Sequence, residues 1–393
     1  MPPIEPKHRE PKHRLTVVQI LPALGSGGVE RGTLEVGKFL VEHGHRSIVI
    51  SAGGRLVEQL QREGSEHVAW EVGRKSLFTL LRYVGRLRRF LRDEKVDILH
   101  VRSRMPGWVA YLAWKNMDPT HRPRLITTVH GLYSRSAYSA VMVKGERVIA
   151  VSETVRAYIR DNYPHALMSH VRVIPRGIEP DLYPRNFRPA PEWLTAWQQS
   201  YPQLIGKKVL TLPGRITRLK GHEDFIDLIA RLKATGEPVH GLIVGGAEQK
   251  KQRYLNALHA KVTQLGLAAD ISFTGQRSDM REIMAISDLV LSLSTKPESF
   301  GRTVLEALSM GVPVIGYDHG GVGEQLARLF PEGRVGLGDM DALVRQSRAI
   351  QAGARIEPCN GPPTLQDMLK DTLSVYEECL ESPTRAVSKL ASR

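Results

Sequence analysis

Two carboxylates stand close to a predicted helix start in the stretch from Lys296 to Gly316. Glu298 lies in a polar loop, and Glu306 lies in the helix that we expect to begin near Thr303. The first turn of a helix presents backbone N–H groups and about half a positive charge, so it is a natural seat for a phosphate group. Carboxylates are poor phosphate ligands, but they readily accept hydrogen bonds from the hydroxyl groups of a ribose or another sugar.

A nucleotide-sugar carries a diphosphate, a ribose and a sugar together, so it is the ligand that fits this combination of groups. The alternative is that Glu298 is an ordinary surface residue of a loop and Glu306 a solvated residue of a helix. The chemistry of this stretch taken alone leaves both interpretations open.

A basic pair follows the predicted strand Lys207–Leu212. Arg215 and Lys220 flank a short loop before a helix that we expect to begin near His222. An arginine can bind phosphate oxygens through two parallel hydrogen bonds, and a lysine adds a compact positive charge. The alternative is that both are solvated basic residues of a surface loop.

Two glycines, Gly27 and Gly28, end a glycine-rich loop between the predicted strand Leu15–Leu21 and a helix from about Val29 to His43. Glycine lets backbone N–H groups come close to an anion. The loop matches neither the dinucleotide-binding fingerprint nor the P-loop, so a simple tight turn is the alternative.

One histidine, His130, directly follows the predicted strand Leu125–Val129. The carboxyl ends of strands in open α/β sheets are where ligands bind. A lone histidine is nevertheless more often structural, so its residue type and position do not by themselves assign it a role.

These groups together resemble the motifs of retaining glycosyltransferases of family 4, which have the GT-B fold. Glu298, seven intervening residues and Glu306 resemble the paired-glutamate signature of that family. The sequence GRITRLKG, residues 214–221, resembles its diphosphate-binding loop, and GGVER, residues 27–31, resembles its first loop. Arg176 is a small departure, because the family more often has asparagine there.

The resemblance implies transfer of a sugar from a nucleotide-diphosphate donor, with retention at the anomeric carbon and with no metal ion or bound cofactor. It implies that Glu306 binds the ribose hydroxyls, Glu298 the sugar hydroxyls, and that His130 lies against the donor sugar. The predicted catalytic residues are His130, Arg215, Lys220 and Glu298. The predicted donor-binding residues are Gly27, Gly28, Arg215, Lys220, Gln276, Ser299, Phe300, Gly301, Thr303 and Glu306.

Strand and helix patterns alternate with short connections along the chain, which predicts parallel doubly wound sheets. We expect an α/β protein with two Rossmann-like domains facing a cleft, the GT-B arrangement that the resemblance also implies. The expected divisions are a disordered basic tail at 1–14, an N-terminal domain at 15–185 with a returning helix within 364–393, and a C-terminal donor domain at 186–363. The Pro- and Trp-rich segment Tyr183–Pro202 is predicted to be a linker.

Composition sets further bounds on the 393 residues. The hydrophobic content of 41% and charged content of 24% are those of an ordinary globular protein. No apolar run approaches the ~20 residues that span a bilayer, and no signal-peptide core precedes the first strand. Two cysteines argue against a disulfide framework and for a cytoplasmic location. An Asp339-Met340-Asp341 sequence is better explained by helix N-capping than by metal binding.

The net charge of +14 predicts an anionic partner. No nucleic-acid-binding motif accompanies the charge, so we expect an anionic glycan or glycolipid acceptor, contacted by Arg102, Arg104 and Arg135, or the inner face of the cytoplasmic membrane. The helix around Leu77–Arg92 has leucines at helical spacing and a dense arginine face, which suits a membrane surface. The alternative is a core-facing stripe with solvated arginines.

The similarity is strongest to bacterial cell-envelope enzymes, including those of lipopolysaccharide biosynthesis. Two other classes stay open at this point. One is a GT-B enzyme that is not a transferase, such as a nucleotide-sugar epimerase. The other is a basic lipid-binding protein on a degenerate scaffold.

Overall fold

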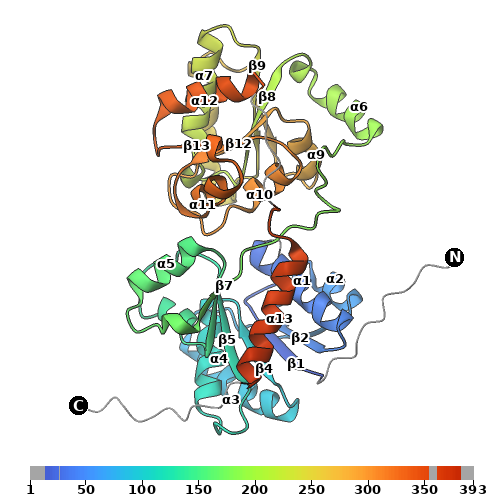
Figure 1. Cartoon of the computed structure of the whole chain (residues 1–393), viewed down its shortest axis with the longest axis vertical. Coiled ribbons are helices and arrows are strands. Elements are labelled where there is room, and N and C mark those ends of the chain that lie inside the picture. Colours follow the sequence, from blue (N-terminus) through green and yellow to red (C-terminus); the bar gives the residue numbers. More distant parts are fainter. Residues whose placement is uncertain (1–13, 26, 354–360, 382–393) are drawn as a thin grey trace, which may run out of the picture. The chain divides into compact units, whose positions relative to one another are not determined.

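The computed structural model describes residues 14–25, 27–353 and 361–381, in two compact units (Figure 1). The first unit contains the chain up to Pro175 and again from Asp367, and the second runs from Arg176 to Gln366. The predicted basic tail lies outside the described residues except for Arg14. Each unit holds one parallel sheet with helices on its faces, so the predicted α/β fold of two Rossmann-like domains is confirmed.

The first unit has a seven-stranded sheet in the order β3-β2-β1-β4-β5-β6-β7. Its strands are β1 (Thr16–Ile20), β2 (Arg46–Ser51), β3 (Glu66–Ala69), β4 (Ile98–Val101), β5 (Arg124–Val129), β6 (Arg147–Ala150) and β7 (Val171–Val173). Its helices are α1 (Gly28–Glu42), α2 (Val57–Arg62), α3 (Leu77–Asp93), α4 (Arg104–Lys115), the short 3-10 helices η1 (Ser139–Val143) and η2 (Met168–His170), α5 (Glu153–Asn162) and most of α13 (Leu365–Glu381).

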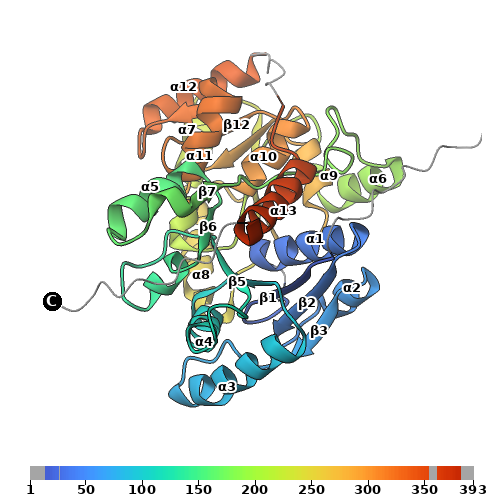
Figure 2. The same cartoon turned by 60° about the horizontal axis from the view of Figure 1, so that its bottom comes forward.

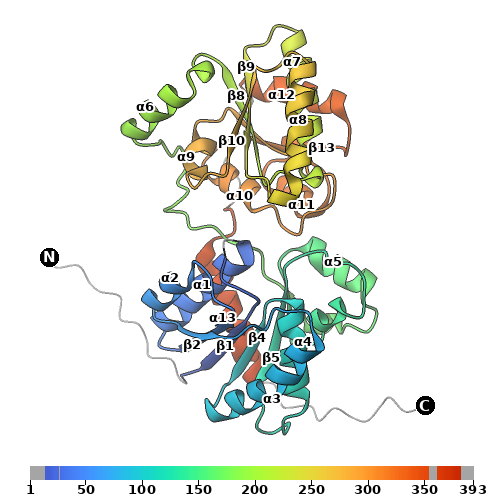
Figure 3. The ribbon, with the colours of Figure 1, turned by 180° about the vertical axis from the view of Figure 1, so that it is seen from behind.

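The second unit has a six-stranded sheet in the order β10-β9-β8-β11-β12-β13. Its strands are β8 (Lys208–Pro213), β9 (Val239–Val244), β10 (Ile271–Gly275), β11 (Leu289–Ser292), β12 (Val314–Tyr317) and β13 (Arg334–Val335). Its α-helices are α6 (Pro191–Ser200), α7 (His222–Ala234), α8 (Gln252–Gln264), α9 (Met280–Ala285), α10 (Arg302–Ser309), α11 (Gly320–Leu329) and α12 (Met340–Gln351). Seen from behind, α7 and α8 lie side by side on one face of this sheet (Figure 3).

In the second sheet the strand order reverses between β8 and β11, and a crevice is expected at this point. Successive strands run outward in opposite directions from β8 and β11, which pair with each other through Leu210 and Leu289. Loops that leave the carboxyl ends of two such strands diverge to opposite faces, and ligands of open α/β sheets bind between them. The first sheet has the corresponding position between β1 and β4, which pair from Val17 to Ile20.

The segment predicted to be a linker is partly helical, and the prediction is wrong for those residues. Residues 191–200 form α6, and Trp197 is buried in a cluster with Val209 and Leu242 of the second unit. Trp193 stacks on Trp197 with ring centroids 5.0 Å apart. The aromatic content that distinguished this segment in the sequence therefore belongs to a hydrophobic core rather than to a solvated connection.

Helix α13 is held to the first unit by buried polar contacts. The Tyr376 hydroxyl lies 2.6 Å from Nδ1 of His100 on β4, and His100 Nε2 lies 2.7 Å from the hydroxyl of Thr128 on β5. Burial raises the pKa of Tyr376, so its hydroxyl stays protonated. At the surface, Arg172 and Glu378 form an ion pair of 2.9 Å.

Within the described ranges, no helix combines the length and the apolar content that crossing a bilayer requires.

Replacing Tyr376 by phenylalanine should lower the free energy of unfolding by about 1–3 kcal/mol, because the buried hydrogen bond between the Tyr376 hydroxyl and His100 is lost. The matched control is Glu378→Gln on the same helix, which removes an exposed ion pair and should cost at most about 1 kcal/mol. Urea denaturation of the two variants checks this. Equal losses of unfolding free energy in the two variants would show that the buried hydrogen bond contributes no more than the exposed ion pair.

Candidate active site

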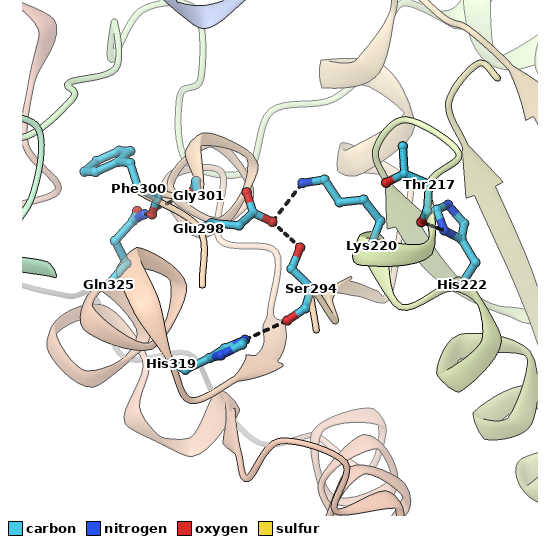
Figure 4. Close-up of polar contacts among 9 residues, drawn as sticks. All are labelled: Thr217, Lys220, His222, Ser294, Glu298, Phe300, Gly301, His319 and Gln325. Atoms are coloured by element: carbon cyan, nitrogen blue, oxygen red, sulfur yellow. Dashed lines mark hydrogen bonds and ion pairs between the residues drawn. The ribbon is translucent and has the colours of Figure 1, made fainter. Parts of the chain in front are cut away.

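Two loops meet where β8 and β11 end. Lys220, in the loop after β8, places its Nζ 2.7 Å from Oε1 of Glu298, in the loop after β11 (Figure 4). The backbone joins the same loops, since the N–H of Thr295 donates to the carbonyl of Leu219 at 2.9 Å. The structure thus brings together two predicted site residues that lie 78 positions apart in the chain.

The Glu298 carboxylate is largely enclosed, with 26% of its side chain exposed. Burial alone would raise the pKa of Glu298, but the positive charge of Lys220 and hydrogen bonds from Lys220 and Ser294 outweigh it, and the pKa lies below its ordinary value. The Ser294 hydroxyl donates to the carboxylate oxygen that faces Lys220. Glu298 is therefore ionised at neutral pH and can only accept hydrogen bonds.

Helix α11 and its N-cap residue His319 hold the backbone of the Glu298 loop through hydrogen bonds. The Nε2–H of His319 donates to the carbonyl of Ser294 at 2.6 Å, and the N–H of Gly321 donates to the carbonyl of Glu298 at 2.7 Å (Figure 4). Gln325 donates from Nε2 to the carbonyl of Gly301 at 3.0 Å and also to that of Phe300.

Sequence reasoning missed Ser294, His319 and Gln325. The turn at residues 318–321 was a visible signal, because a histidine and two glycines directly follow a buried strand. That signal marks a turn, but it does not reveal that the turn supports the loop of Glu298.

Two glycines allow this close packing. Gly221 has φ +71°, and a Cβ there would lie 2.0 Å from the carbonyl oxygen of Leu293 in the neighbouring loop. Gly301 has φ +85° and is the N-cap of α10. Both conformations are in the left-handed region that glycine adopts without steric cost. A side chain at Gly221 would push apart the two loops that hold Lys220 and Glu298.

Glu306 lies in the middle of α10 and is buried, with 6% of the residue exposed. Arg302 donates from Nε to its Oε1 at 3.0 Å. The alternative interpretation of Glu306 as a solvated helical residue is therefore wrong. The first turn of α10, which includes Thr303, comes one residue after the left-handed Gly301, and it begins within one residue of the predicted start.

Arg215 has a different environment from Lys220. Its side chain is 76% exposed, and its guanidinium forms an ion pair of 3.3 Å with Glu248, in the loop after β9. Its neighbour Ile216 donates its N–H to the carbonyl of Gly246 at 3.0 Å, and a Cβ on Gly246 would lie 3.2 Å from the Cβ of Gln276. Arg215 and Gln276 are thus both placed by the loops that follow β8, β9 and β10.

The first unit holds the remaining predicted site residues. Gly27 is the N-cap of α1 and Gly28 is its first residue, and among the residues that the structure describes, none would lie within 4 Å of a Cβ on Gly28. His130 follows β5, and its backbone N–H donates to the hydroxyl of Tyr133 at 3.3 Å. Both features lie at carboxyl ends of strands, as predicted.

The three arginines expected to contact an acceptor differ in exposure. Arg102 is 2% exposed, and its Nε donates to Oε1 of Gln19 at 2.7 Å, so it belongs to the interior. Arg104 lies over the ring of Tyr133, 4.7 Å from its centroid. Arg135 is exposed and lines a cavity of about 520 Å³. The other residues lining this cavity are Ser136, Ala137, Ala140, Val143, Lys144, Asn162, Tyr163, Pro164, His165 and Ala166.

The Asp-x-Asp sequence is a helix cap. Asp339 is the N-cap of α12, and its Oδ1 accepts the N–H of Ala342 at 2.9 Å. The prediction of N-capping is confirmed.

Comparison with known proteins assigns the class. Residues 26–182 match the family model described as Glycosyltransferase Family 4, and residues 195–348 match the model described as Glycosyl transferases group 1. The crystal structure of a glycosyltransferase from Rickettsia africae ESF-5 is 30% identical, with a TM-score of 0.82, and the match covers 94% of this chain and 99% of that one. The chain therefore belongs to the GT-B glycosyltransferases, with a family 4 N-terminal half and a group 1 C-terminal half.

Two further similarities are informative. N-acetyl-alpha-D-glucosaminyl L-malate synthase of Bacillus anthracis is 28% identical over 320 residues, which cover 77% of this chain and 78% of the relative. Anabaena Alr3699/HepE, solved in complex with UDP and glucose, shares the fold at a TM-score of 0.74 and 19% identity, over 93% of this chain and all of that one.

Replacing Lys220 by methionine should change how stability depends on pH. In the wild type the pKa of Glu298 is below its ordinary 4.5, so the stability it contributes is complete above that value and is lost as pH falls through the lowered pKa. In the variant the charge and hydrogen bond of Lys220 are gone while burial and the Ser294 hydrogen bond remain, so the pKa of Glu298 is higher than in the wild type and the carboxylate contributes less stability as pH rises. The stability difference between wild type and variant should therefore grow from about pH 4 to neutrality.

Urea denaturation across this range measures the difference. The matched control is Lys208→Met, which removes the more exposed ion pair of 2.9 Å with Asp288 and should show a smaller change with pH. Identical pH profiles for the two variants would contradict the described electrostatics of Glu298.

Proposed function

We propose that this glycosyltransferase moves a sugar from a nucleotide-diphosphate donor to an anionic glycan or glycolipid acceptor, with retention at the anomeric carbon. The observation that carries the proposal is the contact of Lys220 with Glu298, which joins the loops that follow β8 and β11. The loop of Glu298 leads directly into the first turn of α10. A cation and a helix start suit a diphosphate, and an ionised, largely enclosed carboxylate suits sugar hydroxyls.

The leaving group is the nucleoside diphosphate, on which negative charge develops as the bond to the anomeric carbon breaks. Lys220 and the N–H groups at the start of α10 stabilise that charge, and Arg215 exchanges its exposed contact with Glu248 for the phosphate oxygens. Fixed charges of this kind lower the barrier because they need no reorganisation during the reaction.

The hydroxyl groups of the donor are bound by the two glutamates. Glu306 accepts hydrogen bonds from the ribose and Glu298 from the transferred sugar. Gln276 and its loop lie beside the nucleobase, and residues Ser299, Phe300 and Gly301 line the diphosphate. In the first unit, Gly27 and Gly28 approach the donor through their backbone, for which the open space around Gly28 leaves room, and His130 contacts the sugar.

Retention follows from a front-face displacement. The acceptor oxygen forms its bond to the anomeric carbon on the face from which the diphosphate departs, and the acceptor proton passes to a phosphate oxygen of the leaving group. This path needs neither a protein nucleophile nor a metal ion. The UDP and glucose bound by HepE support a nucleotide-sugar donor without fixing the base for this chain.

The acceptor class is inferred from charge. The net charge is +14, and Arg135 and Lys144 line the cavity of the first unit. Among relatives, the Bacillus anthracis enzyme is named for a malate product, and the lipopolysaccharide core mannosyltransferase LpsB of Rhizobium meliloti is 26% identical over 202 residues. We place this chain in cell-envelope glycan synthesis at the cytoplasmic side, with a phosphorylated lipopolysaccharide core as the first acceptor to test.

Lys220→Ala should reduce donor-dependent turnover by about a hundredfold or more, because it removes a charge that stabilises the leaving diphosphate. Nucleotide release from UDP-, GDP- and ADP-sugars, with candidate core acceptors, measures turnover. Lys208→Ala is the control, since Lys208 forms an exposed ion pair elsewhere in the second unit. Unchanged turnover of a folded Lys220→Ala protein would reject the proposed site.

The product should have the same anomeric configuration as the donor. NMR of the purified product reads that configuration at the new glycosidic bond from the one-bond coupling between the anomeric carbon and its proton. A product of opposite configuration would reject front-face displacement. Conversion of the donor sugar with no acceptor would instead favour an epimerase.

A further inference from the structure

The first turns of α3 expose three large apolar side chains. Leu77, Phe78 and Leu81 are 72%, 68% and 74% exposed. The other large apolar side chains that are exposed in the described part of the chain, such as Leu167 and Leu265, each stand alone in the sequence. Single exposed leucines are normal on a protein surface, but a contiguous group within one helical turn marks an interaction site.

The opposite face of α3 is firmly buried, so rotation of the helix cannot cover these residues. Tyr83, Leu87 and Leu91 are each less than 8% exposed. The Tyr83 hydroxyl accepts the N–H of Glu71 at 3.2 Å, and its ring stacks on Trp70 with centroids 5.8 Å apart. The leucine stripe of the sequence is therefore divided: Leu87 and Leu91 are buried in the core, whereas Leu77 and Leu81 are exposed. Helix α3 itself lies at the edge of the first unit (Figure 2).

The outward face is cationic beyond the apolar group. At 100° per residue, Arg88 lies on the same line of the helix as Leu77 and Leu81, and the other exposed arginines of α3 lie on one side of that line, opposite the side that leads to the buried Leu91. The basic residues of α3 and of the two positions before Ser76 are Arg74, Lys75, Arg82, Arg86, Arg88, Arg89 and Arg92. The same stretch contains one acidic residue, Asp93, which pairs with Arg92 at 3.0 Å.

We propose that this face of α3 docks on an anionic lipid bilayer. Leu77, Phe78 and Leu81 insert among the acyl chains, and the arginines lie at the level of the lipid phosphates, where their aliphatic stems are apolar and their guanidinium groups are hydrated. An apolar tip flanked by positive charge is complementary to a bilayer, whose apolar interior lies beneath an anionic surface. A second copy of the chain fits poorly, because self-association through this face would bring two arginine-rich surfaces together.

This docking surface is connected to the loop that carries His130. Lys75 lies over the ring of Tyr138, 5.3 Å from its centroid, and Arg104 lies 5.4 Å from the same ring. Docking through α3 therefore brings the segment between β5 and η1 close to the bilayer. If the proposed function also holds, the acceptor is a lipid-borne glycan, but docking itself needs neither donor nor acceptor.

Flotation with lipid vesicles tests the proposal on the full chain. Wild-type protein should float with vesicles of phosphatidylcholine mixed with phosphatidylglycerol, and more weakly with phosphatidylcholine alone. The triple variant Leu77→Ser/Phe78→Ser/Leu81→Ser and the double variant Arg88→Glu/Arg89→Glu should each lose about tenfold or more in partitioning. Thermal melting checks that both variants are folded.

Matched controls separate this surface from general charge and hydrophobicity. Leu167→Ser removes another leucine of the first unit that is 60% exposed, and Arg156→Glu/Arg160→Glu changes two exposed arginines of α5. Both controls should keep wild-type partitioning. Partitioning that is unchanged in the serine variant would overturn insertion, and equal loss in the α5 control would overturn the assignment to α3. Wild-type protein that stays unbound, or that forms a dimer lost in the serine variant, would reject the bilayer as the partner.

Discussion

The ion pair between Lys220 and Glu298 is the interaction on which the candidate site depends. Each partner comes from a loop that leaves the sheet where the strand order reverses, so the pair links the two loops that border the expected crevice. Removing one partner from such an enclosed pair leaves an uncompensated charge, which is far more costly than exchanging both. The same two groups are the ones that the proposed function assigns to the diphosphate and the sugar of the donor, so one interaction both shapes the candidate site and supplies its charges.

The fold supports this pair through backbone contacts. Gly221 lets one loop pass within contact distance of the other, and His319 and Gln325 bind carbonyl groups of the Glu298 loop. Loop carbonyls that are bound in this way cannot turn inward, so the carboxylate of Glu298 and the first turn of α10 keep their orientation. The helices and strands thus contribute to the site indirectly, because they hold in place the short polar loops that carry its residues.

The sequence predicted the sheets well because parallel strands are buried on both faces and read as continuous apolar runs. The run Leu289, Val290 and Leu291 of β11, all buried, is such a case. It also predicted Lys220 and Glu298 as members of one site, because both belong to motifs. It did not predict Ser294, His319 or Gln325, since their contacts form only when α11 packs under the loop. Nor could the sequence show which leucines of α3 are buried, because helical spacing predicts an apolar face but not which element packs against it.

Hydrogen exchange in the presence of UDP, GDP or ADP tests the central claim most directly, because it reports where a nucleoside diphosphate binds without requiring the acceptor. The account predicts that at least one of the three slows exchange in two segments together, residues 214–221 and 294–306, and that Lys220→Ala abolishes this protection. Protection confined to other segments, or protection that is unchanged in Lys220→Ala, would contradict the assignment of the donor site.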